Sequence, residues 1–485
     1  MTRMSAPAAI LSSPLSTFAN IVYPFSVRLV LKQDGKDMSR QEFRASISLA
    51  AIFSLRMLGL FMIYPVFAAY GRHLSGATPY KIGLALGIYG LSQAVLQIPF
   101  GLLSDKIGRK SLIIAGLLLF MVGSAVGALS TSIDGMIVGR ALQGGGAVGS
   151  VILALVADLT AEENRTKAMA IVGVTIGGSF MVALIAGPVL AGLVGVPGIF
   201  WVMVGLALVG VGVIQLAVPR PPQTKHHRDA ETVPGLLGRV FANGELLRLD
   251  FGILALHAML TASFLVIPRL LHDTIGVTSD DQWMVYLPVL VVSVVVMVPA
   301  IVLAEKYRHM KAIFLGAVAM LLVSQLLLLV ETRNASMMLL AVTLFFSGFN
   351  ILEACLPSLV TKTAPPEAKG TATGVYSSLQ FFGIFIGGAF GGWVNQTAGT
   401  AAVFELTAGL GLLWFLTTLS MKDPIYLATK LLRIGSNRNT EDIIVKLRAV
   451  PGVADAVIVA EEGLAYLKVD SKLFDIERAE SVVSA

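Results

Sequence analysis

Long apolar runs alternate with short polar connections from residue 46 to residue 420. A helix needs about 20 mostly apolar residues to cross a bilayer, so each run predicts one membrane-spanning helix. The polar segment 219–246 divides the runs into two sets of six, which predicts an all-α membrane bundle of two six-helix halves, 46–218 and 247–420. The twelve expected spans are 46–70, 79–103, 110–130, 133–157, 165–192, 198–218, 247–272, 283–304, 309–331, 334–361, 370–395 and 401–420.

Composition agrees with a membrane protein and excludes an ordinary soluble domain. Hydrophobic residues make up 55% of the 485 residues, charged residues only 14%, and the mean hydropathy is +0.80. Soluble domains carry about 25% charged residues. The formal net charge of +6 could suggest a nucleic-acid partner. Its cations lie in short loops beside apolar runs, so an anionic membrane face explains them better, and we expect a lipid bilayer and no nucleic acid as partner.

Lys and Arg gather in alternate connections, which predicts the orientation of the bundle. They are frequent in the connections after the second, fourth, sixth, eighth and tenth runs and sparse in the others. Cationic loops stay on the cytoplasmic side. Both termini are therefore expected in the cytoplasm. Residues 1–45 are expected to form a disordered extension, because the apolar run 18–31 is too short to span a membrane.

The tail 425–485 has a different pattern, which predicts a small folded domain. Strands are expected at Lys430–Ile434, Val453–Ala460 and Ala465–Val469, with helices starting near Thr440 and at Asp475. The order βαββα is that of an α+β ferredoxin-like fold and resembles small heavy-metal-associated domains. Those domains bind metal through C-x-x-C, whereas the corresponding loop 435–438 reads Gly-Ser-Asn-Arg. No metal site and no cofactor are expected.

The loop 101–110 reads Gly-Leu-Leu-Ser-Asp-Lys-Ile-Gly-Arg-Lys between two apolar runs. The segment could simply be a solvated loop whose cations set the orientation of the bundle in the membrane. The spacing of Gly101, Asp105, Gly108 and Arg109 also resembles the loop between helices 2 and 3 of major facilitator superfamily transporters. That resemblance implies a conformational latch, in which Asp105 faces the start of helix 11 and Arg109 pairs with Asp158 at the end of helix 4.

Two further motifs narrow the resemblance to drug/proton antiporters. Arg140 and Gln143 begin a segment similar to the superfamily pattern R-x-x-Q-G-x-G-A, which implies a part in proton coupling. Alternatively, Arg140 lies near a helix end and its side chain reaches the surface. In the fifth run, the spacing of Gly178, Gly187, Pro188 and Gly192 resembles the antiporter motif, although alanines replace two of its glycines. The alternative is a generic glycine-rich packing face.

A few polar groups interrupt the apolar runs and are candidates for proton coupling or for lining a cavity. They are Arg56, His257, Asn350 and Glu353. Isolated charges in membrane helices need partners or water and are functional candidates by default. Histidine titrates near neutral pH, and Glu353 can carry a proton. Local hydrogen bonds could satisfy the amides instead.

The opening segments of the fifth and eleventh runs, from Glu163 and Glu367, are similar and lie about half a bundle apart, as in transporters built from repeated halves. From about Met38 to Ala485 the chain resembles bacterial superfamily members that end in a ferredoxin-like domain. The resemblance implies a monomeric, proton-coupled antiporter of small molecules in the inner membrane, working by alternating access. The alternatives are a metabolite or sugar carrier, and a membrane sensor signalling through its C-terminal domain. No motif of an enzyme is present.

Overall fold

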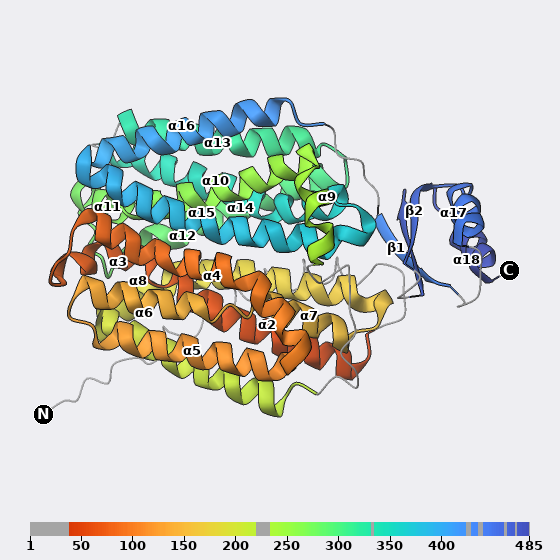
Figure 1. Cartoon of the computed structure of the whole chain (residues 1–485). Coiled ribbons are helices and arrows are strands. Elements are labelled where there is room, and N and C mark those ends of the chain that lie inside the picture. Colours follow the sequence, from red (N-terminus) through yellow and green to blue (C-terminus); the bar gives the residue numbers. More distant parts are fainter. Residues whose placement is uncertain are drawn as a thin grey trace, which may run out of the picture.

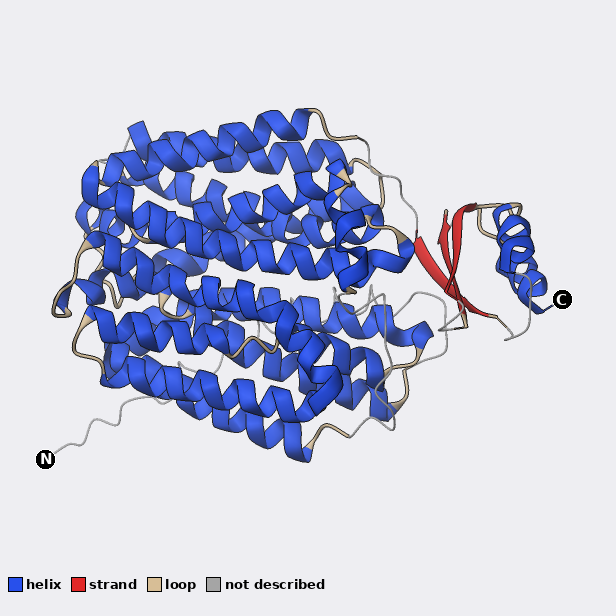
Figure 2. Cartoon of the chain, in the orientation of Figure 1, coloured by secondary structure: helices blue, strands red, loops and turns tan. Residues whose placement is uncertain are grey.

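The computed structural model describes residues 38–219, 233–330, 334–422, 428–434, 440–459, 463–470 and 473–484. Long helices form a bundle, and a small domain containing the strands lies at one end of it (Figures 1 and 2). The helices of the first half are α2 (Arg40–Phe61), α3 (Tyr64–Tyr70), α4 (Pro79–Ile107), α5 (Arg109–Leu129), α6 (Ile133–Gly145), α7 (Gly149–Leu159) and α8 (Glu162–Leu216). Those of the second half are α10 (Gly244–Phe264), α11 (Ile267–Ile275), α12 (Trp283–Glu305), α13 (Met310–Val330), α14 (Ala335–Thr363), α15 (Lys369–Thr397) and α16 (Thr400–Leu419).

The predicted spans are present in the described part of the chain. It holds 11 helical segments long and apolar enough to cross a membrane, and one of them, Lys167–Leu216, is 50 residues long. Within it Gly195 has φ 71°, a conformation that favours glycine, so the two predicted spans 165–192 and 198–218 meet there. Treating this segment as two helices gives the twelve-helix arrangement.

Two predicted boundaries are wrong. The extension was expected to reach residue 45, but α2 begins at Arg40, because Ser39 and Glu42 form a reciprocal cap that satisfies the first backbone N–H groups. The linker was expected to continue to residue 246. Instead, η2 (Pro234–Leu236) and α9 (Leu237–Phe241) precede α10, which begins at Gly244. Residues 1–37 and 220–232 of these two segments lie outside the described residues.

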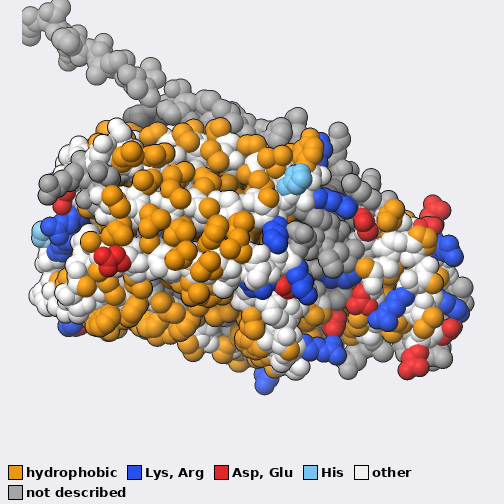
Figure 3. All heavy atoms as spheres, turned by 90° about the horizontal axis from the view of Figure 1, so that it is seen from above, with side chains coloured by type: hydrophobic (Ala, Val, Ile, Leu, Met, Phe, Trp, Pro, Cys, Tyr) orange, Lys and Arg blue, Asp and Glu red, His pale blue; other side chains and the backbone are white. Residues whose placement is uncertain are grey.

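Close helix contacts join the two halves along α4 and α15. A Cβ added to Gly83, Gly87 or Gly90 would collide with the backbone of α15 near Gly388, Phe385 or Phe381. Backbones can approach this closely only where side chains are absent, as is common in membrane bundles. The outer flank of the bundle is covered by hydrophobic side chains, and charged side chains gather mainly toward its ends (Figure 3).

The C-terminal domain is a three-stranded antiparallel sheet of order β1-β3-β2 with two helices. Its elements are β1 (Ala428–Arg433), α17 (Thr440–Arg448), β2 (Val453–Val459), β3 (Leu464–Val469) and α18 (Ile476–Ser484). The predicted order βαββα is therefore observed. Alternate residues of β3 point to opposite faces, so Ala465 and Leu467 join the core with α17 and α18, while Lys468 lies on the other face. Figure 1 places the sheet between these helices and the membrane bundle.

Candidate functional site: a polar cluster and two buried networks

Residues 101–110, expected to form a loop, instead comprise the last turns of α4, a one-residue turn at Gly108 and the start of α5. Gly108 ends one helix and precedes the other, with φ 93°. Residues with a Cβ rarely adopt such a conformation, so a glycine is required there. Gly101 packs against α7, because an added Cβ would lie 3.3 Å from Oγ of Ser150. The two glycines fix the path that positions Asp105 and Arg109.

Arg109 is at the centre of a buried polar cluster. Its Nε donates to Oδ2 of Asp158 at 2.6 Å, and its Nη1 donates to Oγ of Ser104 at 2.9 Å. Nη1 also lies 2.8 Å from Oδ1 of Asp105. The side chains of Arg109 and Asp158 are 1% and 0% exposed. The expected Arg109–Asp158 pair is thus present, and it ties the start of α5 to the end of α7.

Asp105 lies where the two halves approach each other. It lines a cavity of about 40 Å³ together with Gly101 from its own helix and Gly370 and Thr373 from the first turns of α15. The free N–H groups at a helix start favour a nearby carboxylate. The structure therefore brings Asp105 to the helix start that the sequence resemblance implied, across a small cavity.

The glycines of the antiporter-like motif in α8 differ in their packing. A Cβ on Gly187, next to Pro188, would collide with the backbone carbonyl of Met62 at the α2–α3 break, and one on Gly192 would lie 3.1 Å from Cβ of Asp280 in the other half. Gly178 has open space around it. Close packing is therefore confined to the end of the motif that lies away from the C-terminal domain.

The first buried network belongs to the N-terminal half. Arg56 donates to Gln93 at 2.9 Å and to the hydroxyl of Tyr89 at 3.1 Å. Arg140 donates to Gln143 at 2.8 Å and stacks on the ring of Tyr89 at 4.8 Å. Arg140 is 0% exposed, so the alternative of a side chain that reaches the surface is wrong. Tyr89 joins the two arginines.

Within the described ranges, neither arginine of this network has a carboxylate partner. Among the described residues, no ion pair includes Arg56 or Arg140, and one guanidinium nitrogen of each lacks a hydrogen-bond partner. Buried cations are usually paired. The network thus holds positive charge that neutral groups alone solvate.

The second network belongs to the C-terminal half and contains His257 and Glu353. Nδ1 of His257 lies 3.3 Å from the carbonyl of Ile253, which fits a donating Nδ1–H and leaves Nε2 as an acceptor. Nε2 of Gln380 lies 3.0 Å from Nε2 of His257 and 3.2 Å from Oε1 of Glu353. Oε2 of Glu353 is 3.9 Å from Nε2 of His257 and has no hydrogen-bond partner among the residues that the structure describes. The carboxyl group is therefore only partly satisfied.

Asn350 lies on the same helix as Glu353 but makes a separate contact. Its Nδ2 donates to Oγ of Ser293 at 2.7 Å, so α14 is held to α12 there. A local hydrogen bond satisfies this amide, in line with the alternative left open for it. Gln380 was not predicted at all. It is one glutamine among many polar residues of α15, and only the fold reveals that it bridges His257 and Glu353.

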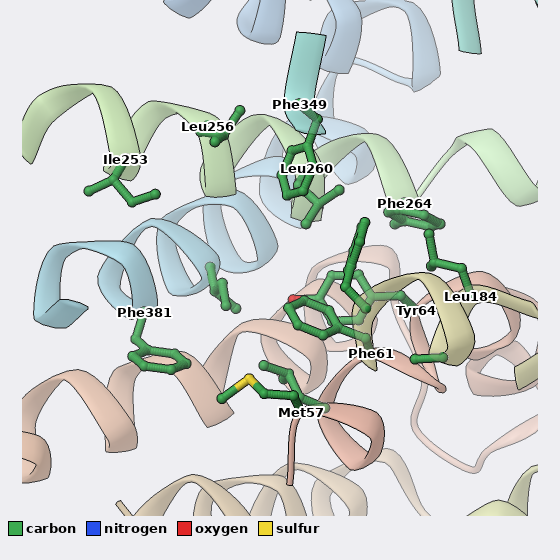
Figure 4. Close-up of a cluster of buried hydrophobic side chains, with 14 of the residues drawn as sticks. Met57, Phe61, Tyr64, Leu184, Ile253, Leu256, Leu260, Phe264, Phe349 and Phe381 are labelled. Atoms are coloured by element: carbon green, nitrogen blue, oxygen red, sulfur yellow. The ribbon is translucent and has the colours of Figure 1, made fainter. Parts of the chain in front are cut away.

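An apolar cluster separates the two halves at the centre of the bundle. Figure 4 shows Phe61 and Tyr64 converging with Phe264 and Phe349 from the opposite half. The hydroxyl of Tyr64 lies 3.2 Å from that of Thr261, and Phe180 packs on Phe349 with ring centroids 5.1 Å apart. We call the five aromatic residues Phe61, Tyr64, Phe180, Phe264 and Phe349 the central plug. Glu353 follows Phe349 toward the C-terminal domain, on one side of the plug, with its side chain 26% exposed.

The C-terminal domain was expected to lack a metal site. No group of three or more His, Cys, Asp or Glu residues that could hold a metal occurs in the described ranges. The loop 435–438, on which the expectation rested, lies outside them.

Comparisons with known proteins identify related families. The model of the Major Facilitator Superfamily matches residues 49–388 and 251–451, and the model described as "YajR YAM domain" matches residues 432–484. The Inner membrane transport protein YajR of Escherichia coli is 43% identical over 91% of this chain and 98% of its own length. The Multidrug resistance protein MdtH of Aeromonas salmonicida is 27% identical, over 70% and 83% of the two chains.

Solved structures share the fold at low sequence identity. The human organic anion transporter MFSD10 has a TM-score of 0.56 and 19% identity, covering 78% of this chain and 99% of its own. The nucleoside transporter NupG has a TM-score of 0.59 and 14% identity, with the same coverage. These structures support the shared helical architecture.

Proposed function

The chain belongs to the Major Facilitator Superfamily, and from that premise we propose that it is a proton-coupled antiporter that exports small molecules by alternating access. It is a multi-pass transporter of the inner membrane rather than an enzyme. The observation that carries the proposal is the incompletely satisfied carboxyl group of Glu353 beside His257. A partly buried carboxylate with an unsatisfied oxygen is stabilised by a proton or a nearby cation.

Antiport follows if proton and substrate cannot occupy the Glu353 site together. A protonated Glu353 no longer attracts a cationic substrate, and a bound cationic substrate disfavours protonation. The central plug would act as the barrier to passage through the bundle, and it must rearrange when the two halves rock. Gradient-driven flux tests the proposal, using reconstituted protein, an imposed pH gradient and a panel of cationic, neutral and anionic compounds. The proposal would be contradicted if the uptake of every transported compound were independent of the pH gradient.

A second candidate function is the carriage of anionic metabolites. Arg56 and Arg140 favour it, because these buried cations lack a carboxylate partner among the described residues and would pair with an anionic substrate. The same panel distinguishes the two candidates by the charge of the compounds that are transported.

We also propose that the transporter is monomeric and that the side carrying the C-terminal domain is cytoplasmic. The cationic loop residues Lys106, Lys362 and Lys369 support the orientation, because they lie at the helix ends on that side. Under this orientation Glu353 lies between the central plug and the cytoplasm.

The residues Asp105, Arg109 and Asp158 are proposed to form a latch that favours the outward-open state. In that state the halves meet on the cytoplasmic side, where Asp105 faces the start of α15. Replacing Asp105 with Asn is expected to shift the population toward the inward-open state by about 1–3 kcal/mol, the usual size of such couplings, and to slow cycling.

Spin-label distances between Ile107 in α4 and Leu419 in α16 measure this shift in a Cys355→Ala background. The exposed neighbour Lys106 provides the matched control, since Lys106→Gln removes a charge from the same loop without touching the cavity. An unchanged distance distribution in Asp105→Asn protein would mean that no latch exists and that the loop mainly sets orientation.

The C-terminal domain is proposed to modulate transport without forming the pathway, and Lys468 suggests how it contacts the bundle. Its Nζ donates to the carbonyls of Lys362 at 2.7 Å and Thr361 at 3.3 Å, at the end of α14. A cation there is favoured by the free carbonyls and the helix dipole. Burial lowers the pKa of Lys468 to about 8, so the amine is still mostly charged at pH 7.

Lys468→Met keeps the apolar stem and removes the donors, and it is expected to loosen the domain from the bundle. Labels at Val445 in α17 and Leu419 in α16 should then give a broadened distance distribution. Lys446→Met is the control, because Lys446 pairs with Asp442 on an exposed face.

A chain ending near residue 425 should still insert and transport. Complete loss of flux at normal membrane levels would show that the domain is essential.

A further inference from the structure

Asp250 is a buried acid that the latch and the two networks leave unused. It lies in α10, is 2% exposed, and neither of its carboxyl oxygens has a hydrogen-bond partner in the part of the chain that the structure describes. No ion pair among the described residues includes it. The nearest charged residues on its own helix, Glu245 and Arg248, pair with each other.

Helix packing places Asp250 at the seam between α10 and α15. A Cβ on Gly383 would collide with the backbone of Leu254, and one on Gly387 would collide with that of Ala258. From the first contact to the second, the residue number rises by four in each helix. The two helices therefore run parallel and keep the same register. One turn earlier, Asp250 comes level with residue 379 and approaches Tyr376.

Tyr376 lies near both Asp250 and Glu353. Its own buried hydroxyl has no hydrogen-bond partner among the described residues. From α16, the indole of Trp414 packs beside Gly252, and its Nε1 is unpartnered too. Two elements, α10 and α15, therefore direct unsatisfied polar atoms into one region of the C-terminal half, whereas Trp414 packs on another face of α10. Among the described residues, none of these three elements brings a cation to Asp250.

An ionised carboxylate is poorly stabilised in this surrounding. Burying an unpaired charge costs several kcal/mol or more even after relaxation, whereas a neutral acid costs much less. A proton needs no cavity, which fits the tight packing of the seam. Asp250 thus holds a proton in the arrangement seen here and would ionise when water reaches the seam.

We propose that Asp250 is a second proton-binding site of the C-terminal half, distinct from Glu353 and His257. At 1.5 Å per helical residue it lies about 10 Å closer to the C-terminal domain than His257. It binds a proton while α10 and α15 are packed together and releases it to water when their seam opens. This site deepens the proposed proton coupling and rests on it for its role in transport.

Infrared difference spectroscopy tests the site without a substrate. The full chain in lipid is stepped between about pH 5 and about pH 10, a range that brackets ordinary and strongly raised carboxyl titrations. A carboxyl group that exchanges its proton gives a C=O band of the protonated acid in the difference spectrum. Asp250→Asn should remove one such band, and Glu353→Gln should remove another. Asp273→Asn, which changes an exposed acid, should leave both unchanged.

Asp250→Glu is the control for a variant that fails to fold. It keeps a carboxyl group, so it should shift the C=O band rather than remove it. An Asp250→Asn spectrum identical to that of the parent, or an Asp250→Glu spectrum without a shifted band, would overturn the proposal. Loss of the Asp250 band together with flux that ignores the pH gradient would uphold the site and refute the coupled function. The two failures are therefore distinguishable.

Discussion

Replacing Arg109 with alanine is expected to destabilise the N-terminal half by about 3–5 kcal/mol, because Asp158 would lose a charged hydrogen-bond donor inside a buried site. Both side chains are almost completely buried, and their 2.6 Å contact is charge-assisted. Asp158→Ala should have a smaller effect, since Arg109 keeps its contacts with Asp105 and Ser104. Thermal unfolding of the purified protein in detergent measures both changes.

The double variant is the sharper part of this prediction. Residues that share one interaction are not additive, so Arg109→Ala/Asp158→Ala should cost much less than the two single changes together. The exposed pair Lys81–Asp134 is the matched control, at 35% and 66% exposure. Asp134→Asn should change stability by less than about 1 kcal/mol. Strict additivity at Arg109 and Asp158 would mean that their contact contributes no coupling.

Neutralising Glu353 and His257 is the second change with a large expected effect. Glu353→Gln should lower gradient-driven flux at least about tenfold, equivalent to about 1.4 kcal/mol, because the amide cannot exchange a proton. His257→Gln should have a smaller effect, since Gln380 can still hold the carboxyl group. Flux with and without a pH gradient in reconstituted vesicles provides the measurement.

Asn350→Ala is the control for packing on the same helix. It removes the hydrogen bond to Ser293 without removing a titratable group. Its flux should therefore keep its dependence on the gradient even if the rate falls. A double Glu353→Gln/His257→Gln variant that couples normally would exclude both residues from the mechanism.

The regular architecture was predictable because a membrane imposes it. Backbone groups inside a bilayer must be satisfied within helices, so apolar runs of sufficient length gave all the spans, and glycine with φ 71° at position 195 merely joins two of them. Strand alternation gave the order of the C-terminal domain. Helix starts were less predictable, since the cap at Ser39 extends α2 into polar sequence.

The contacts between distant elements were predictable only where a motif records them. The latch motif led to the Arg109–Asp158 pair. Gln380, Asp250 and Lys468 carry no comparable sequence signal, because their meaning depends on which helix faces they occupy. Gln380 bridges two other helices, and Lys468 reaches the end of α14 only after the C-terminal domain has packed against the bundle.

Proton movement during transport tests the central claim most directly. Vesicles containing the protein and a pH-sensitive dye inside are given a transported compound on one side, with no gradient imposed beforehand. Proton-coupled antiport requires that the compound drive protons in the opposite direction, and Glu353→Gln is expected to abolish this signal. Transport of the compound without any change in internal pH, in the parent protein, would contradict proton-coupled antiport.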